Sequence, residues 1–156
     1  MNGKVEVHRL KQKLDATFGR IQAVGDDLEL KADFAKYLCV LVSGYLEKAV
    51  VELVQEHARQ CGAPSLQRFV EQKTRRFTNA NAQKLQDLLG SFNPDWRKNA
   101  EGFLVDELKD AVDSIVNLRN TIAHGNSVSV TYHRVSDYYQ CIQQVIDKIA
   151  DLCVPT

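Results

Sequence analysis

The 156-residue chain lacks the features that mark several large classes of protein. Its twenty basic and twenty acidic side chains cancel, so net charge gives no indication of a protein that coats nucleic acid. The longest apolar run, from Tyr37 to Leu46, is about half a membrane span and is interrupted by Ser43 and Gly44. The N-terminus lacks the apolar core of a signal peptide. We therefore expect a soluble, cytoplasmic protein with no membrane partner.

The four cysteines are far apart and form no C-x-x-C pair: Cys39, Cys61, Cys141 and Cys153. Each falls at an apolar position of a helical pattern, where a free thiol behaves as a small hydrophobic side chain. We expect a reducing compartment, no disulfide framework, no metal site and no cofactor.

Apolar residues recur with a helical period along most of the chain, and no repeat or linker interrupts them. The pattern, with Asp26 or Asp27 as a cap and glycines as stops, predicts helices over 7–21, 27–60, 65–73, 80–89, 103–123 and 136–152. We expect a loop over 91–101, a helix end at Gly90, an extended connector over 128–133 and a cap at Ser136. The predicted fold is a single all-α domain over 1–156, an antiparallel helical bundle with short additional helices and one extended connector.

Arg119 lies in the middle of the apolar stripe of the predicted helix 103–123. At about 100° per residue, apolar side chains flank Arg119 on both sides, and the opposite face is polar. Arginine is almost never fully buried unless it is paired, because an unpaired charge in an apolar site is very unfavourable. Arg119 therefore either pairs with a carboxylate or lines a seam where a ligand or a second subunit arrives.

His124 follows Arg119 by five residues and precedes Gly125. A guanidinium matches phosphate oxygens and stays charged, and an imidazole exchanges its proton near neutrality. Together they supply what cleavage of a phosphodiester by a neighbouring 2′-hydroxyl needs, which is acid–base catalysis and charge stabilisation without a metal. The structural alternative is that Arg119 pairs with a buried carboxylate and His124 caps the helix before Gly125.

The segment from Leu118 to Gly125, Leu-Arg-Asn-Thr-Ile-Ala-His-Gly, resembles the R-x(4–6)-H motif of HEPN-domain proteins. The surroundings are also similar, with Ser43-Gly44-Tyr45-Leu46-Glu47 before the motif, and Ser129-Val130-Thr131 and the helix opening 134–139 after it. The chain resembles the RiboL-PSP-type HEPN branch of small bacterial domains over its whole length. HEPN toxins that pair with a nucleotidyltransferase antitoxin usually carry a Tyr two residues after the histidine. This chain has Asn126 at that position, so the resemblance does not extend to pairing with such an antitoxin.

The resemblance implies a metal-independent endoribonuclease of a bacterial defence or toxin-type system. It implies a homodimer with two motifs facing one cleft, RNA as substrate, and an antitoxin or defence-system protein as candidate partner. Arg119 would hold the scissile phosphate, His124 would be the acid or base, and Asn120 would orient one of them or contact the RNA. The products would carry 2′,3′-cyclic phosphate and 5′-hydroxyl ends. The alternative is a non-catalytic HEPN module for RNA binding or assembly.

Glu47 and Ser43 share a narrow polar strip on the otherwise apolar second helix, as neighbours one turn apart. HEPN proteins often place a polar or acidic residue on an early helix near the motif. By this resemblance, Glu47 is expected to hold Arg119 through a charge-assisted pair. The alternative is a solvent-facing strip with no role.

Segment 68–77 is locally basic, with phenylalanines between its charges. Lys73, Arg75 and Arg76 are therefore candidate RNA contacts, since basic residues beside aromatic rings suit a phosphate backbone and an unstacked base. The alternative is an ordinary solvated helix face. Trp96, in the expected loop, either stacks on a base or plugs the end of the bundle.

Overall fold

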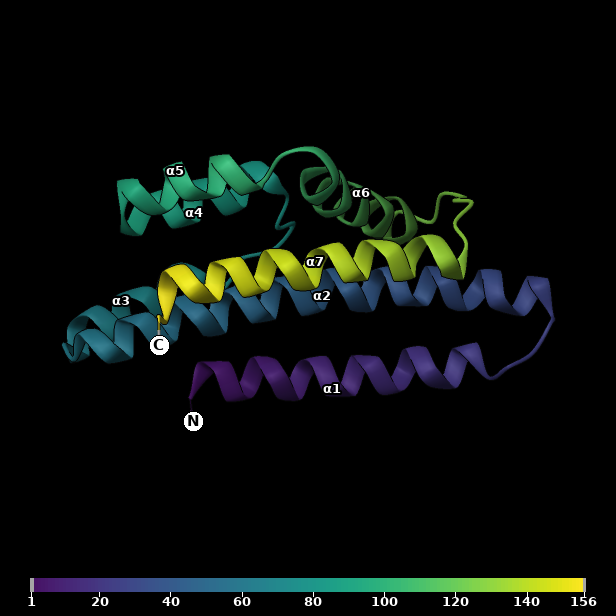
Figure 1. Ribbon diagram of the computed structural model, residues 1–156, viewed down its shortest axis with the longest axis horizontal. Coiled ribbons are helices and arrows are strands. Elements are labelled where there is room, and N and C mark those ends of the chain that lie inside the picture. The colour runs from purple at the N-terminus through teal and green to yellow at the C-terminus, as the bar shows by residue number, and fades with distance from the viewer. Residues whose placement is uncertain (1, 156) are drawn as a thin grey trace.

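The computed structural model describes residues 2–155, so the outermost residues of the predicted domain 1–156 lie outside the described part. These residues form helices and no strands, which confirms the predicted all-α class. The helices are α1 (Gly3–Gln22), α2 (Leu28–Cys61), α3 (Pro64–Thr74), α4 (Ala82–Phe92), α5 (Pro94–Phe103), α6 (Asp106–Ala123) and α7 (Tyr132–Cys153) (Figure 1).

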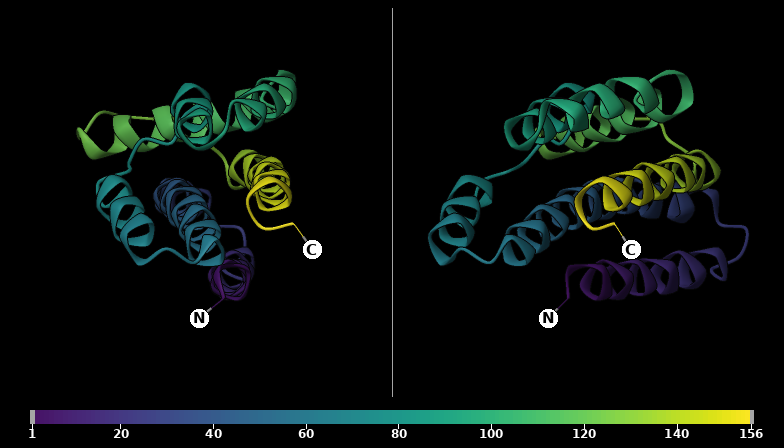
Figure 2. Two further views of the ribbon diagram at one scale, coloured as in Figure 1. Left: turned by 90° about the vertical axis from the view of Figure 1, so that its left-hand side faces the viewer. Right: turned by 60° about the vertical axis from the view of Figure 1, so that its left-hand side comes forward.

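Helix α2 is the centre of the arrangement and packs against α1, α3, α6 and α7. Helix α1 runs antiparallel to α2, whereas α7 runs parallel to it (Figure 1). Helix α6 lies across this group: the left view of Figure 2 shows α1, α2 and α7 end-on and α6 from the side. The helix pair α4–α5 packs on itself and lies over the C-terminal half of α7.

The long helices begin at side-chain caps. The Asp27 carboxylate accepts a hydrogen bond from the Leu30 N–H at 3.0 Å, as one of the two predicted caps of α2. Helix α7 begins earlier than predicted, because the Thr131 hydroxyl accepts from the Arg134 N–H at 3.1 Å. The predicted cap at Ser136 is therefore wrong, and Ser136 lies inside the first turns of α7.

The predicted loop over 91–101 is also wrong, because most of it forms α5. Asn93 ends α4, and its side chain accepts from the Asp95 N–H at 2.8 Å, which caps the next helix. Pro94 follows at the first helical position, where no backbone N–H is needed. Gly90 does not end α4, which continues to Phe92.

Helix α6 begins three residues later than predicted, at Asp106. Leu104 ends α5 and is buried, and Val105 is the N-terminal cap residue of α6. Asp106 has a φ of 52°, in the left-handed region that non-glycine residues seldom adopt. This turn directs α6 across the other helices.

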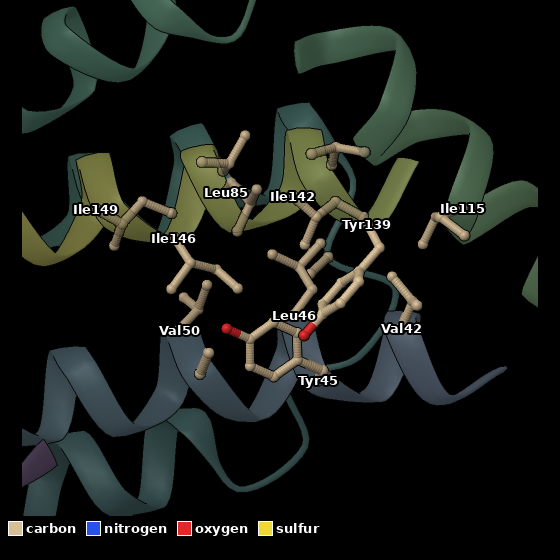
Figure 3. Close-up of a cluster of buried hydrophobic side chains, with 14 of the residues drawn as sticks. Val42, Tyr45, Leu46, Val50, Leu85, Ile115, Tyr139, Ile142, Ile146 and Ile149 are labelled. Atoms are coloured by element: carbon tan, nitrogen blue, oxygen red, sulfur yellow. The ribbon is translucent and has the colours of Figure 1, made fainter. Parts of the chain in front are cut away.

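The core lies between α2 and α7. Figure 3 shows Val42, Tyr45, Leu46 and Val50 of α2 facing Tyr139, Ile142, Ile146 and Ile149 of α7. Helix α1 joins this core at Tyr139, whose ring stacks on Phe18 at a centroid distance of 4.8 Å. The Tyr139 hydroxyl donates to the Asp15 carboxylate at 2.6 Å, so the buried hydroxyl is satisfied by α1.

The N-terminus of α1 lies directly on α2. Gly3 is buried, and a Cβ atom at this position would be 2.7 Å from both the Glu52 carbonyl oxygen and the Glu56 Cβ. The Glu56 carboxylate accepts from the Arg59 Nε at 2.8 Å and from the Gly3 N–H. Burial by itself raises the pKa of Glu56, but these hydrogen bonds and the Arg59 charge hold the pKa below its ordinary value of 4.5.

Gly3→Ala should destabilise the protein, although glycine-to-alanine changes in helices usually stabilise. The added methyl group meets backbone of α2, and such overpacking costs about 1–3 kcal/mol. The matched control is Gly19→Ala in the same helix, where a Cβ meets nothing within 4 Å and a gain of about 0.5–1 kcal/mol is expected. Urea unfolding of both variants measures the difference, and equal effects would contradict the close approach.

Glu56 should make stability depend on acid pH. Its folded-state pKa is lowered, so its contribution is present above the unfolded pKa near 4.5 and is lost as the pH falls through the lower folded value. Urea midpoints measured from pH 6 down to about pH 3 should therefore fall more steeply in the wild type than in Glu56→Gln. Parallel curves for the two proteins would show that Glu56 does not contribute.

Candidate functional site

The predicted motif forms the C-terminal end of α6. His124 is the cap residue, with its N–H donating to the Asn120 carbonyl at 3.0 Å, and its side chain is exposed. Gly125 follows with a φ of 75°, in the left-handed region that favours glycine, and its N–H donates to the Ile122 carbonyl at 3.0 Å. The glycine therefore ends the helix directly after the histidine.

Arg119 lies on the stripe of α6 that contains Val112, Ile115 and Val116, all buried. It stands near the end of this stripe and is half-buried, less covered than its place on the helical wheel predicts. Its Nη1 donates to the Asn120 Oδ1 at 3.2 Å. Within residues 2–155, no acidic side chain lies within 4.0 Å of its guanidinium. The structural alternative, a buried carboxylate paired with Arg119, is thus not what the described residues form.

Glu47 has a different partner from the expected one. Its carboxylate accepts a hydrogen bond from the Asn79 N–H at 3.0 Å and does not pair with Arg119. Asn79 has a φ of 55°, so Glu47 holds a left-handed residue in the connection between α3 and α4. Ser43, one turn before Glu47, is only 1% exposed, so the polar strip does not face solvent there. Its Oγ has no hydrogen-bond partner among the described residues.

The predicted RNA contacts lie away from the motif. Lys73, Arg75 and Arg76 are exposed at the end of α3 and in the turn after it. Figure 1 shows α3 beside the C-terminal part of α2, whereas the α6–α7 connector lies at the other end of the molecule. The Lys73 Nζ is 5.6 Å from the centroid of the Phe69 ring, which is 57% exposed. The pairing of cation and aromatic ring therefore exists, but not next to Arg119.

Trp96 plugs the end of the bundle and is not available to stack on a base. It lies in α5, is 9% exposed, and its ring contacts Phe92 and His57 at centroid distances of 5.8 and 4.6 Å. The His57 Nδ1 is 3.1 Å from the Cys153 carbonyl oxygen, which ties α2 to the end of α7.

A basic groove between α1 and α2 was not predicted from the sequence. It has a volume of about 490 Å³, and its charged lining residues are Lys13, Arg20 and Lys48. Each helix shows part of the signal, because Lys13 and Arg20 are seven residues apart and thus share one face. The sequence alone did not show that α1 places this face beside Lys48.

These features define the class of the protein: an all-α domain with an R-x4-H motif at the end of a transverse helix. Residues 6–154 match the model of the RiboL-PSP-HEPN family. The chain belongs to this family, which confirms the predicted resemblance. A search of curated proteins found no match, and neither did a search of solved structures. Within residues 2–155, no helix has both the length and the apolar character needed to cross a membrane.

The contact between Glu47 and Asn79 predicts a difference between two substitutions. Glu47→Gln keeps an oxygen acceptor for the Asn79 N–H and should leave the free energy of unfolding nearly unchanged. Glu47→Ala leaves that N–H without its partner and should cost about 1–3 kcal/mol. Urea unfolding measures both. Equal losses in the two variants would show that the negative charge of Glu47, and not this hydrogen bond, is what matters.

Proposed function

We propose that the protein is a metal-independent endoribonuclease of a bacterial defence or toxin-type system, and that it acts as a homodimer. The supporting observation is the state of Arg119: a half-buried guanidinium with no acidic neighbour within 4.0 Å in residues 2–155, five residues before an exposed His124. A fixed cation that no carboxylate neutralises is available to an anionic oxygen of a ligand. RNA supplies such oxygens together with the 2′-hydroxyl that the chemistry needs.

The proposed reaction uses the side chains in distinct roles. An imidazole of His124 takes the proton from the 2′-hydroxyl or gives one to the leaving oxygen. The 2′-oxygen attacks phosphorus, the bond from phosphorus to the 5′-oxygen breaks, and that oxygen gains a proton. Arg119 stabilises the charge on the phosphorane oxygens, and Asn120 holds the guanidinium through the 3.2 Å hydrogen bond. The products carry 2′,3′-cyclic phosphate and 5′-hydroxyl ends.

The helical spacing supports a homodimer. Five residues along a helix correspond to a rotation of about 140° and a rise of about 7.5 Å, so Arg119 and His124 of one protomer point in different directions. A second motif across a shared cleft brings an imidazole of one copy toward the guanidinium of the other. The partner proposed for regulation, an antitoxin or another defence-system protein, would act by covering this end of α6.

The remaining predicted residues have secondary places in this proposal. Lys73, Arg75 and Arg76 would contact a part of the RNA away from the point of cleavage, because they lie on α3 and in the connection after it, where Thr74 and Asn79 contact Gln55 and Glu47 of α2. Glu47 supports the site only indirectly, by fixing the connection between α3 and α4. The cytoplasm is the proposed compartment, since it holds the RNA.

His124→Ala and Arg119→Ala should each lower RNA cleavage at least about 100-fold, because general acid–base and charge-stabilising groups each contribute that much. Cleavage of total RNA by the wild type, in buffer with EDTA, should yield fragments with 2′,3′-cyclic phosphate and 5′-hydroxyl ends. The amount of cleaved RNA measures the loss of activity in each variant, and analysis of the fragment ends identifies the products. Circular dichroism and light scattering check that each variant keeps its helices and its oligomeric state.

The matched control is His133→Ala. His133 is also an exposed histidine, nine residues further on, and its Nε2 is 3.4 Å from the Asp137 carboxylate. This variant should cleave like the wild type. Cleavage that persists in both motif variants would refute the assignment, as would a requirement for a divalent metal. Tight binding of RNA that stays intact would favour the non-catalytic module instead.

A further inference from the structure

The groove between α1 and α2 has cations at its edges and no carboxylate in its lining. Arg20 lies at the C-terminal end of α1, and Lys13 and Lys48 lie further along the two helices. None of the three forms an ion pair within residues 2–155. The residues that line the groove are Leu10, Lys13, Leu14, Thr17, Arg20, Tyr37, Val40, Leu41, Gly44, Tyr45 and Lys48. In a chain with zero net charge, this concentration of one sign predicts an anionic ligand.

The groove is elongated and runs along the two helices. Tyr37 and Lys48 are eleven residues apart on α2, which corresponds to about 16 Å along the helix axis. On α1, the Arg20 Nη2 donates to the Thr17 Oγ1 at 3.0 Å, which holds the guanidinium on the groove face. A row of cations along an open channel fits a chain of phosphates better than a single small anion.

Apolar and aromatic surface lies between the charges. Tyr37 is 53% exposed and Val40 is 39% exposed, although both line the groove. An exposed aromatic face beside cations is the arrangement on which unstacked bases stack while the phosphates follow the basic residues. This combination favours a single-stranded nucleic acid over an acidic protein segment.

Gly44 lies in the floor of the groove, in the middle of α2. Glycine is the weakest helix former after proline, and a Cβ at Gly44 would meet nothing within 4 Å in this chain. No packing within the protein therefore explains a glycine at this position. Its effect is to leave the backbone of α2 open to close approach from the groove.

The groove leads toward the end of the molecule that carries the motif. The Tyr132 hydroxyl donates to the Phe18 carbonyl at 3.2 Å, two residues before Arg20, and Tyr132 is eight residues after His124. Figure 1 shows the end of α1 and the α6–α7 connector at the same end of the bundle. We propose that the α1–α2 groove binds a single-stranded segment of the RNA substrate next to the part that is cleaved. This inference rests on the proposed function for its substrate class.

Binding to a fluorescent single-stranded 20-nucleotide RNA tests the proposal in a His124→Ala background, which prevents cleavage during the measurement. Replacing Lys13, Arg20 and Lys48 by glutamine should weaken binding at least tenfold near 0.1 M salt. It should also reduce the slope of log K against log salt by about 2, because each phosphate contact on a single strand contributes about 0.7. The matched control replaces Lys4, Lys98 and Lys148 by glutamine and should change both quantities much less.

Two uncharged substitutions separate shape from charge. Gly44→Leu fills the groove without a clash in the chain and should weaken RNA binding. Gly19→Leu, in α1, has the same open surroundings but lies outside the groove lining, so it should weaken binding much less.

Removing a negative charge beside the groove should have the opposite effect. Asp33→Asn should strengthen RNA binding, because exposed Asp33 precedes Tyr37 by one turn on the same face of α2.

An unchanged affinity and salt slope in the triple variant would overturn the proposal, as would equal effects of Gly44→Leu and Gly19→Leu. A groove-dependent affinity for polyglutamate with unchanged RNA binding would also overturn it, in favour of an acidic protein partner. The result is separate from the test of the proposed function, because binding is read without cleavage. Groove-dependent binding with no cleavage by the wild type would support the groove and refute the nuclease.

Discussion

The burial of α2 is the constraint on which the rest of the structure depends. At about 100° per residue, its buried side chains span roughly 220° around the helix axis, so a single neighbouring helix is not enough to cover them. Helices α1 and α7 cover it along its length, α6 crosses it, and α3 folds back on its last turns. The position of every candidate site follows from this, since the motif lies on a helix that crosses α2 and the groove lies between α2 and α1.

Local sequence patterns predicted most helices because their causes are local. Apolar spacing, an aspartate cap and glycine at a left-handed stop act within a few residues. The pattern failed at Asn93 and Pro94, which were interpreted as a break although they cap and begin α5. It also failed at Ser136, since Thr131, five residues earlier, caps α7. In both cases the residue type was informative, but its role depended on whether an apolar stripe continued beyond it.

The candidate site was predicted where its geometry is local and not where it depends on tertiary structure. Arg119, Asn120, His124 and Gly125 belong to one helix end, so their arrangement follows from helix geometry and a left-handed stop. The partner of Glu47 lies 32 residues away, in a connection whose path is set by the packing of α3 and α4. The basic groove combines two helices, and its existence depends on the antiparallel alignment of α1 with α2, which periodicity does not specify.

The parallel course of α2 and α7 has a further consequence. Because α1 returns along both, the two ends of the described chain lie at one pole of the bundle, and the α6–α7 connector lies at the opposite pole (Figure 1). A tether, an affinity tag or a neighbouring domain joined at either end would therefore project away from Arg119 and His124. This polarity makes the fold suitable as a module that is anchored at one pole and presents the other to its surroundings.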